Sequence, residues 1–254
     1  QGEKETMCDT IRIQMMNTFT IYINEIQADH MVNKSRKGVA LMQYLILNRE
    51  QPVPNQRLLA ALWSEEKSAN PENALKTLVS RLRALLNQLS PGLGQAIVAD
   101  RNAYHWQLLP GMSVDVYEIE DIFAALSGHN GDIAWHKEQY ARLMKLYSGD
   151  LLQNGEPAEW ALARATALHN QYMAAVYSYI DVLKDEENHK EIVNVCRAAL
   201  DVDNFDDRLH MELMTALIKT NRTSEALVQY KHVIHLHYRY LGIQPSDDMQ
   251  EFYK

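Results

Sequence analysis

PENALKTLVSRLRALLNQL, residues 71–89, is the most informative segment of this chain. At about 100° of rotation per residue, its aliphatic side chains gather on one side of a helix. Pro71 stands at the first helical position, where its missing N–H costs nothing. The apolar side of the predicted helix carries Leu75, Leu78, Val79, Leu82, Leu85 and Leu86.

The opposite side of this helix is polar and basic. A helix that enters the major groove of DNA needs this division, because one face is held by the domain while the other offers donors to phosphates and base edges. The alternative is the solvated face of an ordinary amphipathic helix, and the neighbouring elements favour the DNA-binding interpretation. The candidate DNA-binding residues on this face are Asn73, Lys76, Thr77, Ser80, Arg81 and Arg83.

The segments around this helix predict a winged-helix domain over residues 1–110. Alternating apolar residues over 11–23 predict a small antiparallel sheet. Ser35 is a candidate N-cap for a helix over 36–47, and a second helix is expected over 55–63. The run QAIVADRNAYHWQLL predicts a β-hairpin wing with its turn at 100–103. Arg101 and Asn102 at its tip complete the candidate DNA-binding set, with Arg101 placed to reach phosphate or the minor groove.

Residues 111–254 predict a second domain built only of helices. Amphipathic helices fit about 115–126, 134–147, 157–183, 189–200, 207–219 and 224–240. A shift of 34 positions lays EIVNVCRAAL (191–200) over EALVQYKHVI (225–234), so that Cys196 meets Tyr230. A 34-residue period of paired helices is the tetratricopeptide spacing. The fold class expected is therefore mostly α: a winged helix with a small sheet and hairpin wing, then an all-α tetratricopeptide-like domain.

Charge divides the chain in the same place. The formal net charge of −8 seems to argue against nucleic acid, yet residues 1–110 hold 12 basic and 10 acidic residues, a net charge of +2. Residues 111–254 hold 13 basic and 23 acidic residues, a net charge of −10. A slightly basic domain joined to an acidic one fits a DNA-binding module with an attached regulatory module.

The location expected is the cytoplasm. Cys8 and Cys196 stand far apart with no CxxC motif, which suits a reducing compartment. No apolar run approaches the roughly 20 residues of a membrane span, so no membrane partner is expected. The chain begins Gln1-Gly2 without an initiator methionine, and we expect the natural protein to extend beyond it.

Catalytic and metal sites are not indicated. No Gly-rich phosphate loop or nucleophile elbow is present, so we expect no enzyme activity and no cofactor. His232 and His235 stand three residues apart on a predicted helix, but no HExxH motif or carboxylate completes a metal set. Packing is the better interpretation of these histidines.

Taken together, the motifs resemble the bacterial regulators of the AfsR/SARP type, which join an OmpR-like winged helix to a bacterial transcriptional activation domain. The resemblance covers nearly the whole chain from Ile11 to Met249, and its most specific pair is VSRLRALL (79–86) with LGIQPS (241–246). The other matching segments are LLAALW, VDVYEIEDI, YSGDLL and EALVQYKHVI.

The resemblance implies a sequence-specific DNA-binding activator. Its partners would be double-stranded promoter DNA and RNA polymerase, with the chain bound as a homodimer and a small-molecule or protein effector at the helical domain. Two departures from the family pattern concern Asn102-Ala103, where the family tends to carry Gly-Gly before the wing tyrosine, and Pro54, where it often carries a Ser or Thr cap. Asn tolerates positive φ, so a tight turn is still expected.

Two other functions stay open at this point. The first is a protein-interaction scaffold whose winged helix does not bind DNA; such a scaffold has no reason to keep Lys76, Arg81, Arg83 and Arg101 exposed. The second is a ligand sensor, in which the helical domain binds a metabolite that switches the same regulator.

Overall fold

The computed structural model describes residues 9–63, 70–128, 132–155, 158–242 and 246–253. The chain forms two compact units. The first comprises the residues up to Glu118 together with Leu151–Ala165, and the second comprises Ile119–Asp150 and the residues from Thr166 onward. This division differs from the single boundary expected at residue 110, because the chain returns to the first unit after its first two helices in the second.

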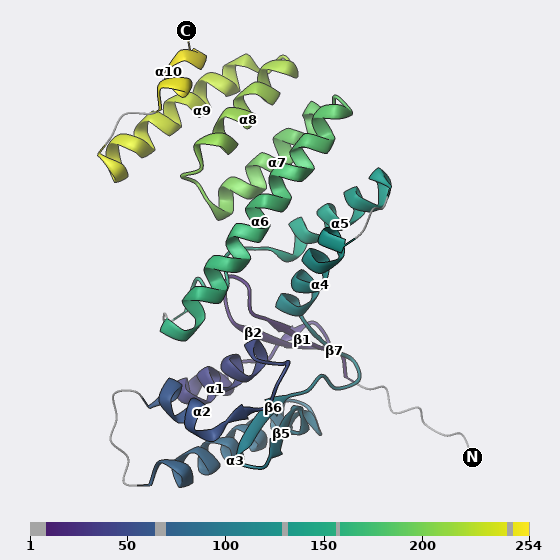
Figure 1. The fold of residues 1–254 in the computed structure, drawn as a ribbon, viewed down its shortest axis with the longest axis vertical. Helices are drawn as coiled ribbons and strands as arrows, with labels where there is room; N and C mark the ends of the chain where they lie inside the picture. The colour runs from purple at the N-terminus through teal and green to yellow at the C-terminus, as the bar shows by residue number, and fades with distance from the viewer. Residues whose placement is uncertain (1–8, 64–69, 129–131, 156–157, 243–245, 254) are drawn as a thin grey trace, which may run out of the picture. The chain divides into compact units, whose positions relative to one another are not determined.

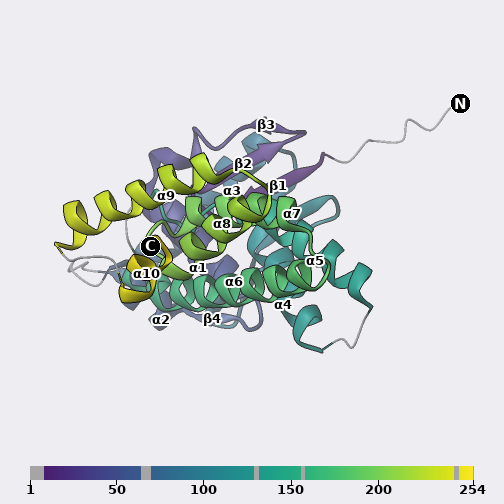
Figure 2. The same ribbon diagram turned by 90° about the horizontal axis from the view of Figure 1, so that it is seen from above.

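A four-stranded sheet forms one part of the first unit, in the order β3-β2-β1-β7. Its strands are β1 (Ile11–Gln14), β2 (Thr20–Ile23), β3 (Ile26–Gln27) and β7 (Met112–Val114) (Figures 1 and 2). β1 pairs antiparallel with β2 but parallel with β7. The sheet is therefore mixed rather than purely antiparallel, because β7 comes from a segment almost 100 residues further along the chain.

A late segment of the chain extends the end of β1. Met16 forms an isolated antiparallel bridge with Leu151. Leu152 N donates to Met15 O at 2.9 Å, and Asn154 N donates to Asn17 O at 2.8 Å. Residues 151–154 thus belong structurally to the winged-helix unit.

Three helices form the other part of this unit: α1 (Arg36–Leu47), α2 (Asn55–Leu62) and α3 (Pro71–Leu89). A short 3₁₀ turn, η1 (Val32–Lys34), precedes α1, and Ser35 caps α1 by accepting a hydrogen bond from Gly38 N, as expected. The core between the helices is formed by apolar side chains, which lose nearly all contact with solvent and so stabilise the fold. It includes Leu41, Met42, Leu45, Leu58, Leu75, Val79, Leu82 and Leu86.

The predicted hairpin is present, with one strand more than expected. β5 (Ile97–Asp100) pairs with β6 (Ala103–Trp106), and β4 (Val53–Pro54) pairs with the other edge of β6. A 3₁₀ turn, η2 (Leu93–Ala96), joins α3 to β5. Two sheets, three helices and a hairpin confirm the winged-helix part of the predicted fold.

The second part of the chain is helical, and after Val114 its described residues contain no strand. The helices are α4 (Asp115–Gly128), α5 (Ile133–Leu146), α6 (Glu159–Asp185), α7 (His189–Val202), α8 (Asp207–Lys219), α9 (Thr223–Leu236) and α10 (Asp247–Tyr253), with a π-helical turn at His237–Leu241. The all-helical prediction is confirmed, while α10 was not expected. Among the residues described, no helix has the length and apolar content needed to cross a membrane.

The 34-residue repeat is present in the structure. α7 and α9 are each 14 residues long and begin 34 positions apart. Cys196 and Tyr230 are both buried, as the repeat predicts; Cys8 lies outside the described residues. The turns that precede the two helices also match, because Asn188 N donates to Leu183 O and, 34 residues later, Arg222 N donates to Leu217 O, each at 2.8 Å.

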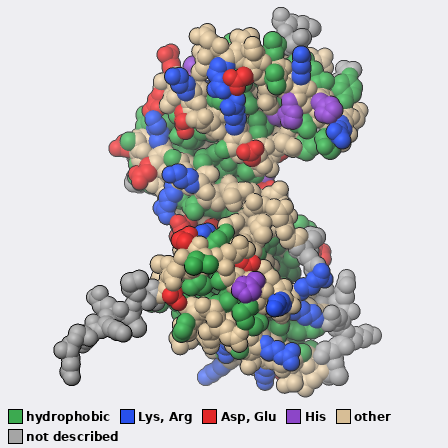
Figure 3. Space-filling model, turned by 180° about the vertical axis from the view of Figure 1, so that it is seen from behind, with side chains coloured by type: hydrophobic (Ala, Val, Ile, Leu, Met, Phe, Trp, Pro, Cys, Tyr) green, Lys and Arg blue, Asp and Glu red, His purple; other side chains and the backbone are tan. Residues whose placement is uncertain are grey.

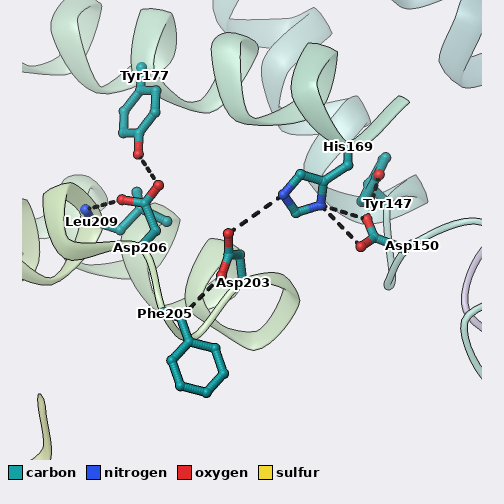
Figure 4. A network of polar contacts seen from close by, with 8 residues as sticks. All are labelled: Tyr147, Asp150, His169, Tyr177, Asp203, Phe205, Asp206 and Leu209. Atoms are coloured by element: carbon teal, nitrogen blue, oxygen red, sulfur yellow. Dashed lines mark hydrogen bonds and ion pairs between the residues drawn. The ribbon is translucent and has the colours of Figure 1, made fainter. Parts of the chain in front are cut away.

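Polar side chains join the helices of this unit (Figure 4). His169 on α6 places Nδ1 2.9 Å from Asp150 Oδ1 and Nε2 3.5 Å from Asp203 Oδ2. Asp206 caps α8 by accepting a hydrogen bond from Leu209 N at 2.8 Å. His169 therefore ties α6 to the segments that follow α5 and α7.

Candidate nucleic-acid interface

The start of α3 is fixed by its own residues. Asn70 is the N-cap, and its Oδ1 accepts a hydrogen bond from Asn73 N at 3.1 Å. Pro71 occupies the first helical position, as the sequence predicts. A capped N-terminus holds the first turn in register, so the polar side chains that follow have a defined direction.

The polar face of α3 is exposed along its first three turns. Thr77 Oγ1 donates to Asn73 O at 2.9 Å, which leaves the hydroxyl's acceptor side open. Neither Lys76 nor Arg81 has an ion-pair partner among the residues that the structure describes. The exposed members of the predicted DNA-binding set on this helix are Asn73, Lys76, Thr77, Ser80 and Arg81.

Arg83 departs from the prediction that its side chain is free for DNA. It is only half-exposed, and its guanidinium donates from Nε and Nη2 to Ile97 O at 3.2 and 2.8 Å. Although helical periodicity puts Arg83 on the polar side of α3, its side chain reaches toward η2 and β5. The structure places Arg83 between α3 and the wing.

Two further residues join α3 to the wing, and the sequence analysis missed both. Gly94 N donates to Asn87 Oδ1 at 2.8 Å. A Cβ at Gly94 would lie 2.6 Å from Arg83 O and 2.9 Å from Asn87 Oδ1. Only glycine lets η2 approach the end of α3 this closely. The run SPGLG indicated only where the helix ends, and nothing local signalled the close approach.

The wing tip carries Arg101 and Asn102, both exposed. Asn102 has a φ of 52°, so the tight turn survives without the glycine pair. Its carbonyl oxygen accepts a hydrogen bond from Asn55 N at 2.8 Å. This bond occupies one of the free N–H groups at the start of α2, where Pro54 supplies no side-chain cap.

Basic side chains accompany this interface. Figure 3 shows Lys and Arg side chains along the lower edge of the unit that contains α1–α3. Among the described residues, no group of three or more His, Cys, Asp or Glu could hold a metal ion. The arrangement offers cationic and hydrogen-bonding groups suited to a polyanion.

The chain matches two sequence families. The family described as "Bacterial transcriptional activator domain" matches residues 119–254, more than half of the chain. The family described as "Transcriptional regulatory protein, C terminal" matches residues 29–102, which include α3. Residues 243–245, within the LGIQPS segment at 241–246, lie outside the described residues.

Two curated relatives align with most of this chain. The chain is 27% identical to the regulatory protein AfsR of Streptomyces coelicolor over 214 residues and 26% identical to that of Streptomyces griseus over 215 residues. Each alignment covers 84% of this chain but 21% of the relative, so the chain spans about a fifth of their length.

A solved structure shares the fold. It is Mycobacterium tuberculosis EmbR in complex with a low-affinity phosphopeptide, with a TM-score of 0.66 and 19% identity, over 96% of this chain and 64% of that one. The families matched are of transcriptional regulators and are not a class of enzymes. The chain belongs to the bacterial transcriptional activator domain family and is a transcriptional regulator of the AfsR/SARP type.

Proposed function

We propose that the chain binds double-stranded promoter DNA in a sequence-specific manner, with α3 in the major groove and the wing against the neighbouring backbone. The observation that carries this proposal is the exposed face of α3, where two cations and three hydrogen-bonding side chains lie opposite a buried aliphatic face. A protein scaffold gains nothing from two exposed cations on one helix that have no ion-pair partner among the described residues. DNA neutralises such cations and releases its own counterions.

The members of this face take different roles in the proposal. Asn73, Lys76 and Ser80 lie toward the start of α3, the part of a recognition helix that meets base edges. Arg81 and, on the wing, Arg101 are proposed to contact phosphates and so to set affinity and register. Asn102 shapes the turn that presents Arg101.

The proposal is tested with DNA selected by the purified protein from a random pool. Its Kd is measured by fluorescence anisotropy over a range of salt concentrations for the parent and for the Lys76→Ala/Arg81→Ala variant. Each phosphate contact removed is expected to flatten the plot of log affinity against log salt by about one unit.

A matched control is Lys231→Ala, which removes an exposed cation from α9. This variant is expected to bind as the parent does. If the double variant binds the selected DNA as tightly as the parent at physiological salt, α3 is not the reading helix, and the scaffold function takes its place.

We further propose that the chain acts in the cytoplasm as an activator that recruits RNA polymerase and binds DNA as a homodimer, with the helical domain open to a small-molecule or protein effector. Exposed Leu227 and Val228 on α9 support a protein contact there. In vitro transcription from a promoter bearing the selected site tests activation. Light scattering of the protein–DNA complex tests the dimer, which a 1:1 complex would contradict.

A further inference from the structure

The winged-helix unit contains a cavity of about 1030 Å³. All of its lining residues belong to this one unit and come from η1, α1, α2, the β1–β2 connection and residues 152–155 and 158–160. This volume lies just above the usual range of small-molecule sites, roughly 300–1,000 Å³. The lining residues from 152 onward lie within the stretch 111–254, where the sequence predicts the helical domain and its effector, but in the structure they belong to the first unit.

Aromatic rings form one wall of this cavity. The rings of Tyr44 and Trp160 meet edge to face, with centroids 5.0 Å apart and planes at 68°. Arg57 Nε donates to Tyr44 Oη at 2.9 Å and fixes the phenol ring. Trp160 is only half-buried, so part of its indole faces the cavity. Phe19, Val39 and the small side chains of Ala40 and Ala61 complete an apolar surface.

Charged and amide groups lie around the same space. Arg57 is exposed, and its Nε and Nη2 are held by Tyr44 Oη and Asn48 Oδ1, so the guanidinium is fixed while Nη1 remains available. A guanidinium fixed in this way loses little entropy when it binds an oxyanion. Other polar lining residues are Asn33, Arg36, Gln43, Asn154 and Glu159.

We propose that this cavity binds a small organic anion that carries a flat ring, of the nucleoside monophosphate class. The aromatic and aliphatic wall receives the ring, since aromatic faces stack on flat ligands. Arg57 receives the phosphate through its available Nη1, since a guanidinium is a strong donor to phosphate oxygens. The amides and Glu159 provide partners for the sugar hydroxyls between ring and phosphate and for the amino group on the ring.

The cavity is lined by two helices that pack against α3, so a bound ligand contacts the supports of α3. α1 and α2 both pack against α3. A ligand held between these helices and the lining residues of 152–155 and 158–160 therefore contacts the two elements that support the exposed face of α3. The binding itself is independent of the proposed DNA function and is tested without DNA.

The test compares AMP, adenosine and inorganic phosphate by isothermal titration calorimetry with the whole chain. These probes supply the ring with the anion, the ring alone and the anion alone. AMP is expected to bind one per chain, with an affinity at least about tenfold above that of either other probe. Arg57→Gln is expected to lower the affinity for AMP toward that for adenosine.

A filled cavity gives a second, independent readout. Ala61→Phe is expected to abolish binding of both AMP and adenosine, and Ala60→Phe serves the same purpose if the first variant melts at a lower temperature than the parent. Lys231→Ala is the control and is expected to bind AMP as the parent does. The proposal is overturned if AMP gives no saturable heat at millimolar concentration, or if phosphate alone binds as tightly as AMP. It is equally overturned if AMP binding survives both Arg57→Gln and a folded cavity-filling variant.

Discussion

Arg83 on α3 donates two hydrogen bonds to one acceptor, the carbonyl oxygen of Ile97 at the start of β5. The planar guanidinium holds both donors in one plane, so the distance between α3 and the hairpin is fixed more tightly than a single bond would fix it. Arg83 is thus a positioning residue. It sets where the wing stands relative to the exposed face of α3.

Replacement of Arg83 by Ala is expected to lower the free energy of unfolding by about 1–2 kcal/mol, since it leaves the half-buried carbonyl without its donors. DNA affinity is expected to fall as the wing loses its position, while the slope of log affinity against log salt stays that of the parent. Arg83→Lys, with one donor group, should recover part of the stability. A slope about one unit flatter in Arg83→Ala would instead assign this residue a phosphate contact.

The close approach at Gly94 gives a second prediction. In Gly94→Ala the new Cβ meets Arg83 O, a backbone atom that cannot rotate away. We expect a loss of about 1–3 kcal/mol, measured by urea unfolding, as for other overpacked sites. Gly128→Ala on α4 is the matched control, because its added Cβ meets nothing within 4 Å. Equal stability of the two variants would show that η2 moves freely against α3.

Asp115 makes the free energy of unfolding depend on pH. Its carboxylate is buried and accepts hydrogen bonds from Met15 N, Met16 N and Val116 N. Burial raises the pKa of Asp115 to about 6, although the three amide hydrogen bonds oppose that rise. The folded state therefore keeps a proton that the unfolded chain has already lost near pH 4.

The stability that this proton confers is present below about pH 4 and is lost as the pH rises through about 6. We expect the parent to lose roughly 2–3 kcal/mol more than Asp115→Asn between these values, because the amide does not titrate. Urea unfolding of both proteins at pH 4 and pH 6.5 measures the difference. Parallel pH profiles for the two proteins would contradict this prediction.

The repeated turns of the helical unit give a fourth prediction. Glu187 and Asn221 occupy equivalent positions after α6 and α8, with φ values of 54° and 59°. A side chain with a Cβ is strained there, and Asn tolerates this region better than Glu. Glu187→Gly is expected to raise stability by about 0.5–1 kcal/mol, and Asn221→Gly by less. Thermal unfolding measures both, and a lower melting temperature for Glu187→Gly would contradict the argument.

Local patterns in the sequence predicted most of the elements. The helix at 36–47 was expected with its cap at Ser35, and both agree with the structure. The 34-residue shift aligned Cys196 with Tyr230 because helix packing repeats whenever the same helix pair is stacked again. Such features depend on residues within one or two turns of each other, which sequence periodicity records well.

Features that depend on distant partners could not be predicted in this way. β7 is three residues long and gains its strand identity only by pairing with β1. The helical periodicity of the sequence assigns Arg83 to the polar side of α3. Only the position of Ile97 in the structure shows that the donors of Arg83 are occupied. Likewise, nothing in the sequence around Trp160 indicates that its ring meets Tyr44, more than 100 residues earlier.

The bridge between Met16 and Leu151 also fixes the order in which parts of the chain can fold during synthesis. β1 is made first, but the residues that cover its end are made only after α4 and α5 have been added. Because a ribosome adds residues in order, the winged-helix unit cannot close until the first two helices of its neighbour have left the exit tunnel. For the same reason, a gene fusion that joins a foreign effector domain directly after residue 118 would leave the end of β1 uncovered, whereas a junction after residue 165 would keep it paired.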